Sequence, residues 1–148
     1  MDAQQALADL TEISSQIRSA VLLDEGGAVK ASTLADDDAR RMAEAAMELL
    51  SAAERTRPGR GPARLTQLEA ATLQGSVFVV RDHGSVIAAT TSAEPTVGLV
   101  FYDLKSCLRS AAGKKPQAPA ATATRDTESE ETTAVQEPSA ETNAGGSA

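Results

Sequence analysis

The chain has 148 residues, of which 41% are hydrophobic and 2% aromatic, and its formal net charge is −7. This length predicts one domain with a single core and excludes a multidomain enzyme. An acidic chain has no long-range attraction for nucleic acid phosphates or anionic lipid headgroups, so we expect neither as a partner.

Cysteine and histidine each occur once, as Cys107 and His83. A single cysteine forms no internal disulfide, and the clusters of cysteine and histidine that hold zinc or haem are absent. The first residues lack a basic stretch, and nowhere do about 18 apolar residues follow one another. We therefore expect no export signal, no membrane insertion and a cytoplasmic location.

The composition changes at Gly113. From there the chain is rich in Ala, Thr, Ser, Pro and Glu, and Val135 is the one branched aliphatic residue. Such a segment buries too little apolar surface to offset its ordering entropy. We expect a domain over residues 1–112 and a disordered acidic tail over residues 113–148.

The start of the chain has the periodicity of an amphipathic helix, with apolar residues at Ala6, Leu10, Ile13 and Ile17. Asp2 and Gln5 have the spacing of a capping box before this helix. Two short β-prone runs, 20–23 and 28–32, follow on either side of a turn that ends in Gly26-Gly27. Glycines between two such runs predict a hairpin.

A second helix is predicted after Asp36, Asp37 and Asp38, since acidic residues cap free N–H groups and complement the positive helix end. Its apolar positions cover an arc of roughly 160°, against ~100° for a helix that lies on one sheet. These positions are Met42, Ala43, Ala46, Met47, Leu49, Leu50 and Ala53. The extra width predicts a second packing surface.

Three strands are predicted next, over residues 65–73, 76–81 and 85–91, with a tight hairpin at Asp82-His83-Gly84. A last helix follows Pro95, with apolar residues at Val97, Val100, Phe101, Leu104, Leu108 and Ala111. The order is helix, two strands, helix, three strands, helix. It predicts an α+β fold with one five-stranded antiparallel sheet and helices on both of its faces.

This order resembles the Roadblock family, which is named for the dynein light chain and is also found in bacteria as partners of small Ras-like GTPases. The resemblance covers residues 3–112. Its most specific part is the strand SVIAATTS, followed by TVGLVFYDLKSCLRSA, in which Gly98-Leu99 stands where family members show an aliphatic "G-L". The first helix and the hairpin AVLLDEGGAVKAST are also similar to the family's opening.

The resemblance implies a homodimer in which the central helices pack side by side and the third strands pair. It points to the second helix, at Ala43, Met47 and Leu50, and to the third strand, at Leu65, Gln67 and Glu69. Either edge of the helix could face the partner subunit, because Met47 and Leu50 lie near one edge and Met42 and Leu49 nearer the other.

No catalytic, cofactor or metal site is predicted. Cys107 lies at the edge of an apolar stripe without a basic activator, so we interpret it as a packing residue. His83 lies in a turn beside Asp82, where side chains rarely converge for proton transfer. The three aspartates suit a helix start better than the octahedral coordination of Mg²⁺. No glycine-rich phosphate loop occurs.

Two groups of residues are candidates for binding a partner. Four arginines in residues 55–64, among them Arg57 and Arg60, form either a solvated loop or a grip for an acidic protein; no aromatic residue accompanies them to stack on bases. Leu99 and Tyr102 lie off the stripe of the last helix, where they either anchor a partner or meet the first helix.

The leading hypothesis is a non-enzymatic homodimeric scaffold that regulates a small Ras-like GTPase. The alternative is a small sensory or ligand-binding module with an apolar pocket between its sheet and helices.

Overall fold

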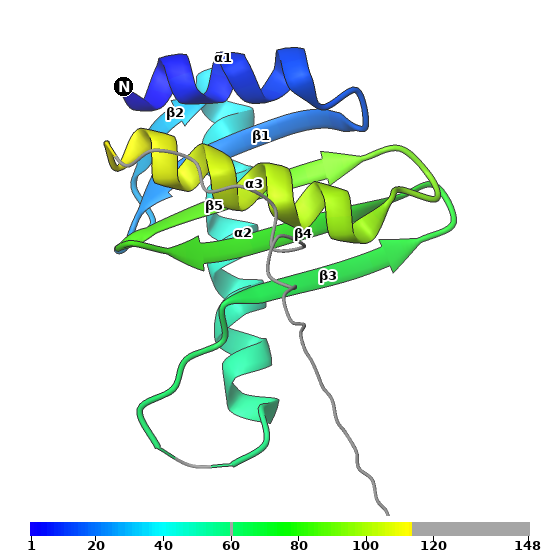
Figure 1. Cartoon of the computed structure of the whole chain (residues 1–148). Helices are drawn as coiled ribbons and strands as arrows, with labels where there is room; N and C mark the ends of the chain where they lie inside the picture. The colour runs from blue at the N-terminus through cyan, green and yellow to red at the C-terminus, as the bar shows by residue number, and fades with distance from the viewer. Residues whose placement is uncertain (60, 114–148) are drawn as a thin grey trace, which may run out of the picture. The chain divides into compact units, whose positions relative to one another are not determined.

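Three helices lie against a single sheet in the computed structural model, which describes residues 1–59 and 61–113 (Figure 1). The tail is predicted to be disordered over residues 113–148. Of these residues, all that follow Gly113 lie outside the described part. The elements are α1 (Ala3–Ile13), β1 (Ile17–Asp24), β2 (Val29–Ser32), α2 (Asp36–Thr56), β3 (Gln67–Thr72), β4 (Gly75–Asp82), β5 (Ser85–Thr91) and α3 (Val97–Ala111).

The sheet has five strands in the order β2-β1-β5-β4-β3, and every neighbouring pair is antiparallel. The predicted fold class is therefore confirmed. Because β1 pairs with β5, the first and last strands of the chain lie side by side in the middle of the sheet. Strands β2 and β3 form its two edges.

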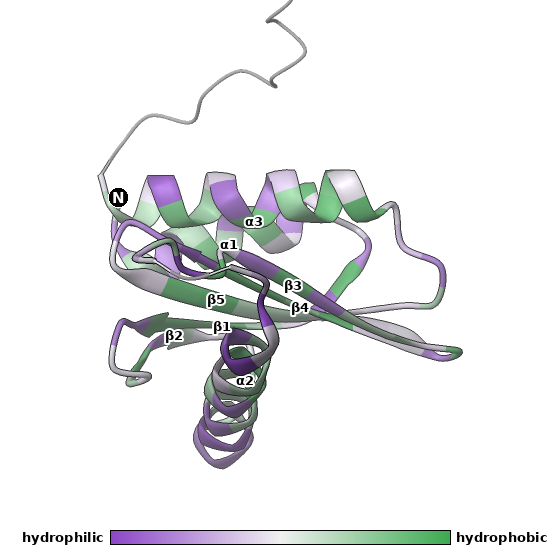
Figure 2. Ribbon diagram, turned by 90° about the horizontal axis from the view of Figure 1, so that it is seen from below, coloured by the Kyte–Doolittle hydropathy of each residue, from purple (hydrophilic) through white to green (hydrophobic). Residues whose placement is uncertain are grey.

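Helices α1 and α3 cover one face of the sheet, and α2 crosses the other face (Figure 2). Strand β1 shows how the sequence builds both layers: Ala20 and Leu22 pack towards α1 and α3, whereas Val21 and Leu23 pack towards α2. Successive side chains of a strand point to opposite faces, so a strand covered on both sides is apolar throughout.

Helix α1 is shorter than its apolar spacing predicts. The helix ends at Ile13, whose side chain is 75% exposed, and Ile17 is the first residue of β1. The buried side of α1 is formed by Ala6, Leu7 and Leu10. Half of the predicted capping box forms, because the Asp2 carboxylate accepts a hydrogen bond from the Gln5 N–H at 2.8 Å.

Helix α2 starts at Asp36, so the three aspartates occupy its first turn, while Ala35 is the N-cap residue and offers no side-chain hydrogen bond. The predicted capping by these aspartates is therefore wrong, but their carboxylates still complement the positive end of the helix dipole. With 21 residues, α2 is the longest helix, and its second half extends past the edge strand β3 (Figure 1).

The predicted tight hairpin between β4 and β5 is present, with Asp82 and Ser85 paired and His83-Gly84 as the loop. His83 has a φ of 50° and Gly84 a φ of 71°. Positive φ at both central residues is typical of the turn whose twist matches that of the two strands. His83 is thus a turn residue.

Candidate interaction surface on α2 and β3

One side of α2 is covered by the sheet. The four residues Ala39, Ala43, Ala46 and Leu50 are buried there against Val21, Val79 and Ala88. Ala43 and Leu50, which the resemblance suggested as dimer contacts, therefore use their side chains within the single chain. Small alanines let the helix lie close to the strands, and Leu50 belongs to the same buried cluster.

A second row of apolar residues runs along one edge of α2, and we call it the outer α2 stripe. It consists of Met42, Ala45, Leu49 and Ala52, spaced three, four and three residues apart. Ala45 is exposed and the other three are half-buried, with Met42 and Leu49 packed in part against the core beneath the helix. Residues at this spacing lie above one another on a helix, so the stripe is a continuous apolar strip. Its small alanines would allow a second helix to pack closely against it.

Met47 lies on the opposite edge of α2. A Cβ atom built on Gly27 would stand 3.0 Å from Cγ of Met47, so this side chain packs on the turn between β1 and β2. The two edges of the helix thus differ. One is used by the hairpin of the same chain, and the other carries the outer α2 stripe.

Strand β3 has one free side in the described part of the chain, because it is bonded to β4 alone. The Arg81 N–H donates to the Thr66 carbonyl at 2.8 Å, which fixes the alternation along the strand. Even-numbered residues direct their backbone groups to β4, and Gln67, Glu69 and Ala71 direct theirs to the free side. The edge therefore offers unpaired N–H and C=O groups for another strand.

Glu54 joins the end of α2 to the start of β3. Its carboxylate accepts a hydrogen bond from the Leu65 N–H and forms ion pairs with Arg57 at 2.7 Å and Arg81 at 3.5 Å. The bond from Leu65 and the two nearby guanidinium groups lower the pKa of Glu54 below its ordinary 4.5, although partial desolvation acts in the opposite direction. Leu65, one of the predicted dimer contacts, is thus part of the connection between helix and strand.

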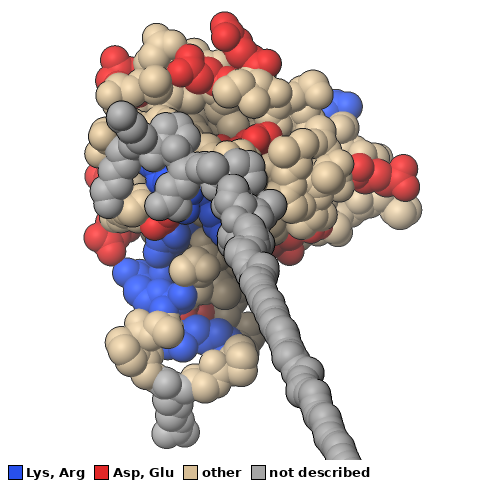
Figure 3. All heavy atoms as spheres, in the orientation of Figure 1, with Lys and Arg blue, Asp and Glu red and all other residues tan. Residues whose placement is uncertain are grey.

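Basic side chains gather over the second half of α2 and the segment after it (Figure 3). Arg57 serves the loop itself, since it pairs with Glu54 and donates to the Gly61 carbonyl at 2.9 Å. Arg64 pairs with Glu25 at 3.1 Å, and both side chains are largely exposed. Arg60, the other predicted arginine, lies outside the described residues.

The two candidates on α3 are placed differently. Leu99 is 48% exposed on the first turn of the helix, as expected for a residue off the buried stripe. Tyr102 is half-buried and lines a pocket between α1 and α3. Cys107 is buried against α1, where its thiol donates to the Ala6 carbonyl at 3.4 Å, and burial raises its pKa to about 12. A thiol with this pKa is a packing group and a poor nucleophile.

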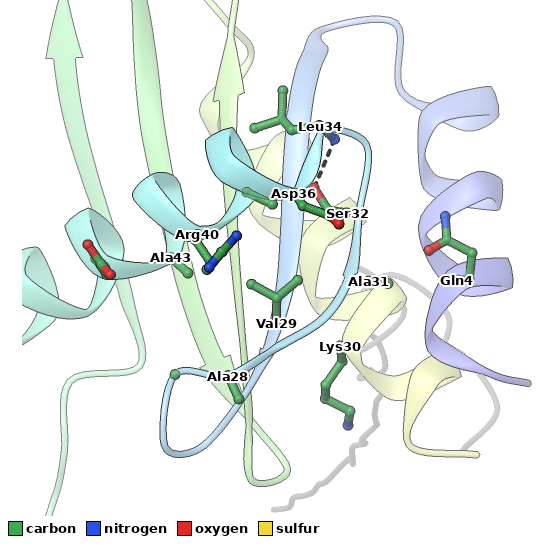
Figure 4. A pocket seen from close by; sticks show the side chains of 13 residues that line it. Gln4, Ala28, Val29, Lys30, Ala31, Ser32, Leu34, Asp36, Arg40 and Ala43 are labelled. Carbon is green, nitrogen blue, oxygen red and sulfur yellow. Dashed lines mark hydrogen bonds between the residues drawn. The ribbon is translucent and has the colours of Figure 1, made fainter.

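A wide pocket of about 660 Å³ lies between the edge strand β2 and the first half of α2 (Figure 4). The Leu34 N–H donates to the Ser32 hydroxyl at its rim, at 2.8 Å. Lys30, Asp36 and Arg40 contribute charges of both signs. The lining contains no histidine or cysteine, and no cluster of residues that could hold a metal ion occurs in the described part of the chain.

None of the described helices combines the length and the apolar character that a membrane crossing requires. The outer α2 stripe was only partly visible in the sequence. The wide apolar arc indicated a second surface, but Ala45 and Ala52 did not stand out because alanine is common on exposed helix positions.

Comparisons with known proteins agree with this architecture. A family model described as the Roadblock/LC7 domain matches residues 3–91. The solved Roadblock/LC7 domain from Streptomyces avermitilis has 25% identity and a TM-score of 0.68, over 76% of this chain and 97% of that one. A second such domain from that organism has 23% identity and a TM-score of 0.57, over 72% and 94%.

The gliding protein MglB from Thermus thermophilus shares the fold, with 19% identity and a TM-score of 0.55 over 75% of this chain and 86% of that one. A comparison with curated proteins found no match. The family model covers more than half of the chain, from the first helix to the end of β5. The chain therefore belongs to the Roadblock/LC7 domain family.

Proposed function

We propose that this chain forms a homodimer that binds and regulates a small Ras-like GTPase, without catalysing a reaction of its own. The observation that carries the proposal is the outer α2 stripe together with the free β3 edge, in a chain similar to bacterial partners of such GTPases. An apolar helix edge and an unpaired strand both gain stability from a second copy.

The arrangement of these two features supports one form of dimer. Strand β3 would pair with β3 of a second copy through the backbone groups of Gln67, Glu69 and Ala71. The two sheets would then be continuous, and the overhanging second half of each α2 would lie over the other subunit. In a two-fold arrangement the outer α2 stripes would face each other, so each of their residues contributes twice. Ala43, Met47 and Leu50, which the resemblance suggested as dimer contacts, pack within the single chain. In the proposed dimer the contacts are made instead by Met42, Ala45, Leu49 and Ala52.

Sedimentation equilibrium of the full chain tests the dimer, which would have twice the 15.2 kDa mass of the chain. Ala45→Glu places a charge in the outer α2 stripe at a position that is exposed in the single chain, and we expect monomers with unchanged helical circular dichroism. Ser51→Glu, on another exposed side of α2, is the matched control and should leave the dimer intact. A monomeric wild-type protein would contradict the proposal.

The strand contact has its own test. Glu69→Pro removes an N–H that points to the free side, so it spares the bonds between β3 and β4. Glu69→Thr removes the same carboxylate but keeps the N–H. We expect the proline variant to dissociate at least about tenfold more readily than the threonine variant, which corresponds to roughly 1.4 kcal/mol. Equal dissociation of both variants would exclude strand pairing at this edge.

GTPase binding is tested by mixing the dimer with small Ras-like GTPases from the same organism, in GDP and GTP forms. We expect binding at micromolar concentration and a changed rate of nucleotide exchange or hydrolysis. Leu99→Glu tests a partner contact away from α2 and β3, and it should weaken binding without dissociating the dimer. Absence of binding to every such GTPase would refute the regulatory role, and would leave the ligand-binding alternative.

A further inference from the structure

A second pocket lies between α1 and α3, on the face of the sheet opposite α2, and we call it the α1–α3 pocket. The two helices lie side by side over the sheet (Figures 1 and 2). The pocket has a volume of about 310 Å³, near the lower end of the range of small-molecule sites. It plays no part in the proposed dimer, because α2 and β3 are not among its lining residues.

The walls of the α1–α3 pocket are mainly apolar. Ala6 and Leu10 of α1 are buried at its base, and Cys107 of α3 is buried beside them. Ile13 at the end of α1 also lines the pocket, and its side chain is the strongly exposed one that the helix periodicity had placed in the core. An aliphatic chain in the pocket would cover part of this exposed surface.

Two polar groups lie in these apolar walls. Asp103 lines the pocket with only 7% of its surface exposed, and within the described residues its carboxylate forms no ion pair. The Ser106 hydroxyl, one turn further along α3, is buried in the pocket wall without a hydrogen-bond partner. An unpaired buried polar group lowers the stability of the fold, and a buried charge without a counter-ion lowers it more.

The surroundings of Asp103 favour a positive charge. Desolvation by burial raises the pKa of the Asp103 carboxyl, and the nearby Ser14 hydroxyl acts in the opposite direction. Asp9 of α1 is a second carboxylate in the lining. No Lys, Arg or His side chain lines the pocket, but Met1, which carries the α-ammonium group of the chain, lies at its exposed rim. A cation would therefore meet two carboxylates without repulsion from a basic side chain.

We propose that the α1–α3 pocket binds a small organic amine with an aliphatic body. The protonated amine would donate hydrogen bonds to the Asp103 carboxylate and the Ser106 hydroxyl oxygen. The aliphatic body would lie against Leu10 and Ile13. This ligand supplies a counter-ion to the Asp103 carboxylate and a partner to the Ser106 hydroxyl. A carboxylic acid would be repelled by Asp9 and Asp103, and a neutral alcohol would leave the carboxylate without a counter-ion. The proposal is independent of GTPase binding.

Titrating the full ¹⁵N-labelled chain with hexylamine, hexanol and hexanoate, followed by NMR, tests the proposal. The three probes share one aliphatic body and differ in charge. We expect hexylamine to shift the amide signals of α1 and α3 and to bind at least about tenfold more tightly than hexanol. Hexanoate should not bind measurably. Equal affinity for hexylamine and hexanol, or shifts confined to other elements, would overturn the proposal.

Variants separate the pocket from general attraction to an acidic protein. Asp103→Asn keeps the shape of the side chain and removes its charge, and we expect it to weaken hexylamine binding at least about tenfold while leaving hexanol unaffected. Ser106→Ala should weaken hexylamine binding by a smaller factor, and it tests the site independently if the asparagine variant folds poorly. Asp38→Asn, on the first turn of α2, is the matched control. Unchanged affinity in both pocket variants would refute the site.

Discussion

The Glu54 carboxylate accepts a hydrogen bond from the backbone N–H of Leu65, and this bond joins the end of α2 to the segment that enters β3. Glu54, Arg57 and Arg81 together connect α2 to the sheet at this point. They therefore fix the position of the outer α2 stripe relative to the free β3 edge, and these are the two features of the proposed dimer. We therefore expect the proposed dimer to depend on the stability of this junction.

Replacing Glu54 by Gln is expected to lower the melting temperature by roughly 2–5 °C at neutral pH, because a neutral amide is a weaker partner for the Leu65 N–H and the two guanidinium groups. The native pKa of Glu54 lies below 4.5, so the unfolded chain binds the proton more readily. The carboxylate thus stabilises the fold above pH 4.5, and this contribution is lost as the pH falls through the native pKa. Thermal unfolding from pH 7 to pH 3 should show the two proteins converging.

Glu44→Gln, an exposed change on the same helix, is the control for this series and should unfold like the wild type throughout. If the melting temperature of the Glu54→Gln variant stayed below that of the wild type at the lowest pH, the loss would be due to packing and not to the charge.

Gly75 at the start of β4 approaches β5 so closely that no side chain fits. A Cβ atom there would stand 2.2 Å from the Thr91 carbonyl oxygen, which is backbone and cannot move aside alone. Gly75→Ala is expected to cost about 1–3 kcal/mol in the free energy of unfolding, measured in urea. Gly98→Ala is the matched control, since nothing lies within 4 Å of that position, and alanine in the first turn of α3 should be neutral or stabilising by less than about 1 kcal/mol. Similar losses in both variants would show that the close approach of β4 to β5 does not set the cost.

His83 occupies a backbone conformation that residues with a Cβ atom rarely adopt, with a φ of 50°. Asparagine tolerates this region better, and Asn-Gly is the preferred sequence for this turn. His83→Asn is expected to raise the free energy of unfolding by up to ~1 kcal/mol. His83→Ala, which keeps the Cβ atom and gives up the contact with Asp82, should not stabilise the protein. If His83→Ala also raised the free energy of unfolding, the gain would come from removing the imidazole and not from relieving the backbone conformation.

The order of elements and the antiparallel sheet could be predicted because each run of residues carries its own periodicity and turn residues. The end of α1 could not be predicted, because Ile13 and Ile17 continue the helical spacing. The chain is already a strand at Ile17 because this residue pairs with Thr91 of β5. The same holds for Asp103. Its burial arises from contact between α1 and α3, which are distant in sequence, so no local pattern marked it as part of a pocket.

Asp103 should destabilise the fold at neutral pH. Burial raises the pKa of this carboxyl above its ordinary 3.8, so the native state holds the proton more tightly than the unfolded chain does. The resulting stabilisation is present below pH 3.8 and is lost as the pH rises through the native pKa. Asp103→Asn should therefore stabilise the protein at pH 7 by on the order of 1 kcal/mol, and the difference should vanish near pH 3.

Urea unfolding at both pH values measures this difference. The neighbouring titratable groups do not alter its sign, because Asp9 is common to both proteins and the Cys107 thiol, with a pKa of about 12, stays neutral throughout. A loss of stability at pH 7 would identify Asp103 as a structural hydrogen-bond acceptor. A gain in stability together with weaker hexylamine binding would mean that the buried charge is retained for the ligand, since a residue that lowers stability persists where function requires it.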